Sequence, residues 1–338
     1  MAGFAGSLLV LGLATMPTGG LAQERIDGAI QKHGYFQQKI APEEITVEHG
    51  REFKGAHRVA ISVFNVAFPR EFHYAAVSKG HSFLGDRASS AKAYMDTSMT
   101  GIDHATQQRI TDQAYALFVE QLQGAGYEVV DYAGLAQLAP EYSKWTSLPN
   151  FSQGRYGTYV APTGRALYFL QGDSAKRFTG GFFGEKTELR LFDRPQAFTR
   201  SPYIAHDGKV GIIAVTLVVD YGVYSSSGRS NKVGKGAMVA FKEGVALAAG
   251  SFIDSGTMLE YWGPDSGGFP AGVYLQQPVR SDKPFGSVNR LAQSEEKSVG
   301  VGVQEVTIQA DPAKFEAVAN EVIGIAVPKL VSVMAAAR

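Results

Sequence analysis

The stretch that decides the fold is residues 57–68, HRVAISVFNVAF. As an extended strand it is apolar on both sides: Val59, Ile61 and Val63 share one face, and residues 64, 66 and 68 share the other further along. A strand that is apolar on both faces is usually covered on both sides. We therefore predict an inner strand of a sheet with a layer packed against each face.

A helix and a second strand follow this strand. Residues 105–123 carry apolar side chains at helical spacing and predict a helix. Asp103 is a favourable N-cap, and Gly124 and Gly126 are typical of a helix end. Residues 127–131, YEVVD, read as a short strand, and residues 135–142 as a second helix. Two strands that flank a helix in one unit normally lie parallel, with a right-handed crossover. The order predicts a layered α/β domain.

The second half of the chain carries three further strong signals. Residues 210–221, VGIIAVTLVVDY, form the most apolar run beyond residue 22 and predict a central strand. Residues 235–253 read as two short strands with a turn at 242–244. Their alternate positions are mostly small, whereas a lipid-facing barrel strand alternates with polar residues, so we expect this segment to pack in protein.

Residues 298–309 read as a strand with a bulge, and Asp311-Pro312 as the start of a last helix. The inner face expected for that helix consists of Phe315, Val318, Ala319, Val322, Ile325 and Ala326.

Two stretches lack a clear period. Residues 69–104 are an excursion that could hold an extra hairpin, a small helix or a partner-binding arm. Residues 255–286 are rich in Gly, Pro and aromatic residues and read as an ordered loop region or small subdomain. The expected layout is a lead-in at 23–56 and a single α/β domain at 57–338, with insertions at 69–104 and 255–297.

Residues 1–22 resemble a secretory signal peptide. They hold no charged residue, their apolar core is LLVLGL at 8–13, and Gly20 and Ala22 occupy the −3 and −1 positions of a cleavage site. The apolar run is shorter than the roughly 20 residues that span a bilayer. We predict export to the periplasm, the outer membrane or the cell surface, with no transmembrane helix.

Composition excludes several classes of function. The 338 residues carry 32 basic and 32 acidic side chains, so the chain has no basic surplus with which to bind nucleic acid. It contains no Cys, which excludes disulfides, thiolate zinc sites, a Cys nucleophile and a lipid anchor on an N-terminal Cys.

The segment 58–135 resembles the start of the domain shared by CsgG-type curli secretion-channel proteins and the TolB N-terminal domain. The resemblance rests on residues 59–65 as the opening strand, 111–123 as the helix, and 126–131 with Leu135 as the second strand and helix start. Residues 215–221 resemble the central strand of that family. The resemblance implies an α/β sandwich: a mixed sheet with flanking helices and a CsgG- or anticodon-binding-domain-like core, plus inserted loops or hairpins. It also implies an envelope protein that is often oligomeric and non-enzymatic.

No complete catalytic set is visible in the sequence. Gly172-Asp173-Ser174 follows an apolar run, as the nucleophile does in SGNH hydrolases, but the sole later His is His206, and Tyr203 stands where that family places its Asp. We predict no catalytic residue, no cofactor and no metal site.

Aromatic residues beside carboxylates can bind sugars, and Glu260 and Asp265 flank such a group. The candidate partner- or ligand-binding residues are Tyr261, Trp262, Phe269 and Tyr274.

Three functional hypotheses remain open. The first is an exported, non-enzymatic envelope protein that forms a homo-oligomer or acts with an outer-membrane, secretion or peptidoglycan-associated partner. The second is a periplasmic glycan- or ligand-binding protein, and the third is an SGNH-like hydrolase.

Overall fold

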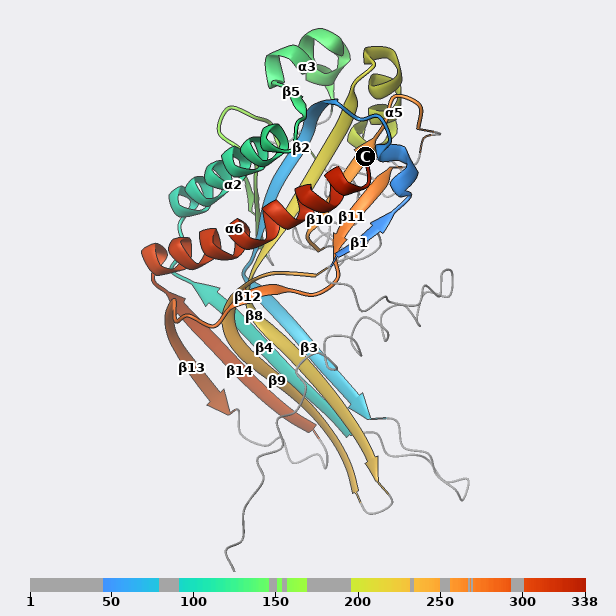
Figure 1. The fold of residues 1–338 in the computed structure, drawn as a ribbon. Coiled ribbons are helices and arrows are strands. Elements are labelled where there is room, and N and C mark those ends of the chain that lie inside the picture. The colour runs from blue at the N-terminus through green and yellow to red at the C-terminus, as the bar shows by residue number, and fades with distance from the viewer. Residues whose placement is uncertain are drawn as a thin grey trace, which may run out of the picture. The chain divides into compact units, whose positions relative to one another are not determined.

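Two mixed sheets and four helices make up the described part of the chain (Figure 1). The computed structural model describes residues 45–78, 91–145, 151–153, 157–168, 196–231, 234–249, 256–266, 268, 270–292 and 301–338. The α/β class predicted from the sequence is confirmed. The predicted signal peptide and lead-in residues 23–44 lie outside the described residues.

The larger sheet is built around strands β2 and β8, which pair in parallel. Its strand order is β1-β11-β10-β8-β2-β7-β6, and β5 shares an edge of β2 with β7. The bounds are β1 (Ile45–Glu48), β2 (Arg58–Pro69), β5 (Glu128–Val130), β6 (Phe151–Gln153), β7 (Gly157–Val160), β8 (Gly211–Asn231), β10 (Met258–Trp262) and β11 (Ala271–Leu275). Strand β5 pairs with β2 in parallel, as the strand–helix–strand order predicted.

Strand β2 is buried on both faces, as predicted, but its residues are distributed differently between the faces. The register of β2 with β8 shifts between Ile61 and Val63, so Ser62 forms a bulge. The extra residue brings the two predicted apolar sets onto one face. That face consists of Val59, Ile61, Phe64, Val66 and Phe68, and Val63 lies in the cluster on the opposite face.

The bulge is stabilised by side chains from elsewhere in the fold. Arg165 donates from its Nη1 to the carbonyl of Ile61 at 3.1 Å. The hydroxyl of Tyr142 donates to the carbonyl of Ser62, and the Ser62 hydroxyl donates to Ile213 O at 3.3 Å. Buried carbonyls need such partners, so the bulge is a built feature of the sheet.

Residues 255–286 are not a loop region or subdomain, because β10 and β11 within them are inner strands of the larger sheet. Glycine there makes room for aromatic rings. A Cβ on Gly272 would lie 2.2 Å from the ring of Tyr274, which folds back over that residue. The strand β12 (Val279–Ser281) follows and pairs with β9 (Gly234–Leu247).

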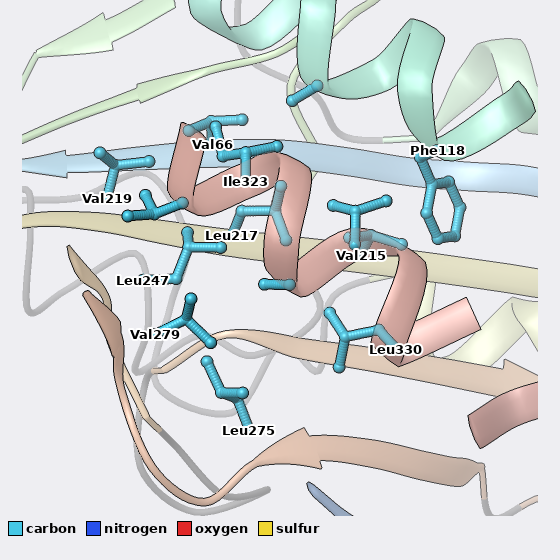
Figure 2. Packing of buried hydrophobic residues seen from close by; sticks show 14 of the residues in the cluster. Val66, Phe118, Val215, Leu217, Val219, Leu247, Leu275, Val279, Ile323 and Leu330 are labelled. Atoms are coloured by element: carbon cyan, nitrogen blue, oxygen red, sulfur yellow. The ribbon is translucent and has the colours of Figure 1, made fainter. Parts of the chain in front are cut away.

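Helices cover both faces of the larger sheet. Helices α2 (His104–Gly124) and α6 (Pro312–Ala336) pack on one face, and the elements on the other face are α3 (Tyr132–Leu138), α5 (Gln196–Gly208) and the 3-10 turn η2 (Pro140–Lys144). A further 3-10 turn, η1 (Gly50–Phe53), precedes β2. In Figure 2, Ile323 and Leu330 of α6 and Phe118 of α2 lie beside Val215 and Leu217 of β8. This cluster is the main core.

The inner face of α6 differs from the prediction at one position. Ile325 is 44% exposed, and Ile323 is buried in its place. Because successive helical residues are about 100° apart, Ile325 falls just beyond the edge of the arc that contacts the sheet. Among the described helices, α6 alone has the length and hydropathy to cross a membrane, and half of that apolar window is buried in the core.

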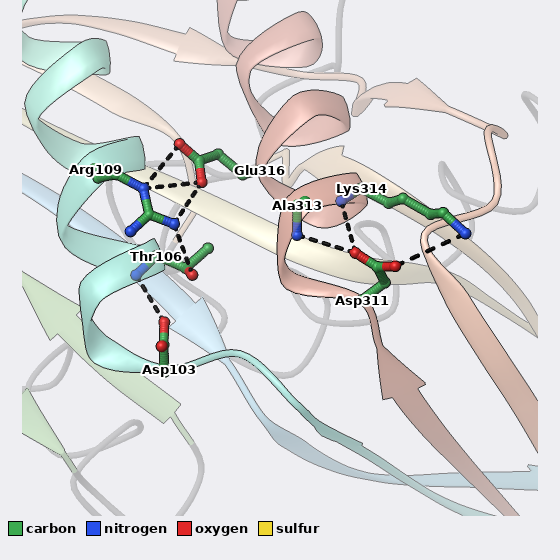
Figure 3. Close-up of polar contacts among 7 residues, drawn as sticks. All are labelled: Asp103, Thr106, Arg109, Asp311, Ala313, Lys314 and Glu316. Carbon is green, nitrogen blue, oxygen red and sulfur yellow. Dashed lines mark hydrogen bonds and ion pairs between the residues drawn. The ribbon is translucent and has the colours of Figure 1, made fainter.

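Both long helices begin at an aspartate, as predicted (Figure 3). Asp103 accepts the amide of Thr106 at 2.8 Å, and hydrogen bonding first with the Thr106 side chain and then with this amide lowers the pKa of its carboxyl. Asp311 accepts the amides of Ala313 and Lys314, each at 3.1 Å. A cap of this kind contributes about 1 kcal/mol.

The two helices are also joined across their surface. Arg109 of α2 binds Glu316 of α6, with Nη2 and Oε2 2.7 Å apart (Figure 3). The arginine is half exposed, and exposed ion pairs contribute little to stability. The contact therefore aligns the two helices but adds little to the free energy of unfolding.

Candidate functional site: the hairpin sheet and its edge

Strand β8 extends well beyond the helix-covered core. It has 21 residues, whereas a strand has about 5–6 on average. Its first part pairs with β2 and β10, and from Val219 onwards it pairs with β9. The connection between β8 and β9, residues 232–233, lies outside the described residues.

The turn predicted at residues 242–244 is wrong, because β9 runs continuously through them. Gly244 has a positive φ of 155°, and a Cβ there would lie 2.8 Å from the carbonyl oxygen of Ser281. The glycine is therefore required by the close approach of β12. The expectation that this segment packs in protein is confirmed where side chains are described: Val245 and Leu247 are fully buried, and Phe241 is 6% exposed.

The second sheet, called the hairpin sheet below, is formed by two further antiparallel strand pairs in the order β13-β14-β4-β3. Its strands are β3 (Glu71–Ser78), β4 (Ala91–Thr100), β13 (Gly286–Ala292) and β14 (Val301–Ala310). Strands β4 and β14 pair in parallel, and the outer pairs are antiparallel. The excursion at 69–104 thus contains a hairpin, one of the three expected alternatives. The bulge predicted in 298–309 is wrong, because the register of β14 with β4 is uninterrupted.

One face of this sheet packs against the β8–β9 hairpin. Its buried residues include Met95, Thr97, Met99, Val306 and Ile308. The Tyr221 hydroxyl donates to Thr97 O at 3.0 Å, and the Tyr221 ring lies 5.6 Å from that of Phe72. The alternate residues, among them Asp96, Thr100 and Gln309, are exposed. The sheet is therefore amphipathic, with one buried face and one face exposed to solvent.

Strand β13 is an exposed edge. It pairs with β14 on one side, and no strand among the described residues pairs with its other side. Ser287, Asn289 and Arg290 are exposed, and Val288 is half buried. Arg290 is held by Glu243 of β9, with Nη2 and Oε2 2.5 Å apart.

The hydrogen-bond pattern fixes which amides of β13 point outward. Asp311 N donates to Phe285 O at 2.8 Å, so residues 285 and 311 form a hydrogen-bonded pair. Since such pairs alternate along an antiparallel ladder, Ser287 and Asn289 bond to β14, whereas the amides of Val288 and Arg290 point away. An exposed row of outward amides and carbonyls is a template for a further strand.

The candidate ligand-binding aromatics do not form an exposed surface. Tyr261 and Tyr274 are 1% exposed and Trp262 is fully buried, while Phe269 lies outside the described residues. Tyr261 stacks on Phe53 with ring centroids 4.9 Å apart, in the cluster under α6. Trp262 belongs to the cluster on the opposite face. A sugar platform needs an accessible ring, so these three side chains serve the core in this structure.

The described residues do not include both the serine and the histidine that the hydrolase hypothesis requires. Ser174 lies outside them. His206 is an exposed residue of α5, with Nδ1 3.0 Å from Oδ1 of Asp207. Within the described ranges, no group of three or more His, Asp or Glu residues is arranged to hold a metal ion.

Comparison with known proteins supplies no relative, because no family model, curated protein or solved structure matches this chain. The exposed edge at β13 was missed in the sequence, where residues 286–292 fell within a predicted insertion. The strand is defined by its pairing in register with 304–310, which the sequence of 286–292 alone does not indicate.

Proposed function

We propose that this chain is an exported, non-enzymatic protein of the bacterial cell envelope that self-assembles through its hairpin sheet, in an assembly at the outer membrane. We further propose a core of the CsgG or TolB N-terminal kind. The succession of α2, β5 and α3 after β2 supports that proposal, although β3 and β4 stand between β2 and α2, and so does the pairing of β2 with β8.

The observation that carries the proposal is the exposed edge of β13. Single-chain domains usually blunt such an edge with charge, proline, a bulge or a covering element. The guanidinium of Arg290 is turned back toward Glu243, and the outward backbone groups belong to a strand whose described side chains are mostly exposed. A strand from a second copy can add there by backbone hydrogen bonds alone.

A proline at Val288 tests this edge directly. We expect Val288→Pro to abolish self-assembly, because it removes an outward amide and places a ring on the edge while the ladder to β14 keeps its bonds. The readout is the mass in solution, by light scattering and native mass spectrometry.

The matched control is Val288→Ala, which loses the same side chain but keeps the amide. It should assemble like the wild type and melt close to the proline variant. If Val288→Pro assembles with wild-type mass, β13 is not the assembly edge. If both variants lose assembly and melt far below the wild type, the side chain rather than the edge is responsible.

A further inference from the structure

The centre of β10 contains a carboxyl group in an unusual environment. The Glu260 residue is 0% exposed, and neither of its carboxyl oxygens has a hydrogen-bond partner in the described part of the chain. Burying an unpaired carboxylate is costly, and buried polar groups in native proteins are nearly always paired. Such a group calls for an explanation beyond packing.

The strand register shows what surrounds Glu260 in the sheet. Directly opposite it lie Ala214 of β8 and Gly272 of β11, so its two nearest cross-strand neighbours are small. The Tyr274 ring occupies the space over Gly272. One strand further out, Glu48 of β1 is opposite Gly272 on its other side. Two carboxyls therefore flank one glycine, with a phenol ring over it.

Among the described residues, the titratable groups that pack near Glu260 offer it no positive charge. From β11 it faces Tyr274, from β1 the half-buried Glu48, and from β8 the apolar Ala214. Helix α5 packs on the same face of the sheet, and its titratable residues are Arg200, Tyr203, His206 and Asp207, all exposed.

Burial alone raises the pKa of Glu260 to about 8. Burial also raises the pKa of Glu48, against the smaller opposing effect of His49. The pKa of Tyr274 is raised by burial first and then by Glu260 and Glu48. All three groups therefore resist ionisation in the closed sheet.

We propose that Glu260 is a proton switch for the β10–β11–β1 end of the larger sheet: it stays a neutral acid while the strands are closed, and loss of its proton to water loosens them. The carboxylate so formed would lie in a dry site, with a second acid, Glu48, on the other side of Gly272. Hydrating it requires that β11 and β10 separate, and β1 is carried along because it pairs with β11.

The direction of the pH effect follows from linkage. An unfolded glutamate titrates near 4.5, whereas the folded one titrates near 8. Below pH 4.5 both states hold the proton and Glu260 has no effect. Between these values the unfolded state releases a proton that the folded state keeps, so stability is lost as the pH rises, by up to about tenfold per pH unit in the folded-to-unfolded ratio.

The test compares the full chain with Glu260→Gln in urea unfolding at pH 5, 6.5 and 8. The wild type should lose at least about 100-fold in the folded-to-unfolded ratio between pH 5 and 8 relative to the variant. Hydrogen exchange at pH 8 should be faster in the wild type at residues 258–262 and 271–275. The matched control Glu120→Gln removes an exposed glutamate of α2, keeps the buried acid and should retain the wild-type slope.

Parallel pH profiles for the wild type and Glu260→Gln would overturn the proposal. So would an exchange difference spread evenly over the chain. Infrared spectroscopy of the wild type is a test that does not depend on whether the variant folds. The absorption band of a neutral carboxyl group should persist at pH 7 and disappear above pH 8. A wild type with no neutral carboxyl at pH 7 contradicts the switch.

Discussion

Val245→Asp is expected to destabilise the folded chain by at least about 3 kcal/mol. Val245 is fully buried in the main core, on β9 and opposite Ser281 of β12. An aspartate there either desolvates its charge or takes up a proton and remains poorly paired, and both outcomes favour the unfolded state. Lower folding yield and loss of assembly should accompany the change.

The measurement is urea unfolding at constant pH, with Gln309→Asp as the control. Gln309 is an exposed residue of β14, so a carboxylate there meets water and should change stability by less than about 0.5 kcal/mol. If Val245→Asp melts and assembles like the wild type, β9 is exposed at this point and the packing described above is wrong.

Trp262→Ala is expected to cost about 3–5 kcal/mol, the usual range for a large aromatic in a core. Trp262 is fully buried, pairs with Ile212 across β10 and β8, and packs in the cluster that includes Ile204 of α5. Truncation would leave a cavity between the sheet and α5.

Denaturant unfolding of Trp262→Ala and Tyr203→Ala checks this. Tyr203 is also aromatic but is 63% exposed on α5, so its loss should be nearly neutral. Wild-type stability in Trp262→Ala would show that the tryptophan is not a core residue and would restore it as a surface candidate. If the expected loss is found, reduced ligand binding by this variant reports unfolding.

The elements that the sequence predicted well are those with local signals at both ends. Helix α2 begins at its aspartate cap, and Gly126, at a φ of 84°, follows its last turn. Strands β2 and β8 carried continuous apolar runs, which is typical of strands covered on both faces. Their position at the centre of the sheet followed from those runs.

The misassigned elements depended on long-range contacts. The bulge at Ser62 requires Tyr142 and Arg165 from distant segments, so the alternation of β2 alone assigned its faces wrongly. Gly244 was taken as a turn signal, and Gly272 fell in a stretch predicted to be a loop region. Gly244 instead makes room for the carbonyl of Ser281 in β12, and Gly272 for the ring of Tyr274 in its own strand. Strand β10 was not predicted, because its aromatic and acidic residues are typical of a binding loop. The composition of this stretch does not indicate that these side chains are buried.

The exposed edge at β13 could not be predicted because an edge strand and an inner strand share the same alternation. A strand lies at an edge when no other strand pairs with one of its sides. For β13 this depends on how residues 285–311 fold together. Glu260 was noted beside the aromatic residues in the sequence, but its lack of a partner appears only once Ala214 and Gly272 are placed opposite it.

The mass of the wild-type protein in solution tests the central claim most directly. Light scattering with native mass spectrometry, at micromolar concentration and moderate salt, should give an integer multiple of the subunit mass, and Val288→Pro should reduce it to one subunit. A wild type that is strictly monomeric under these conditions, and that recovers no envelope partner, would contradict self-assembly through the hairpin sheet.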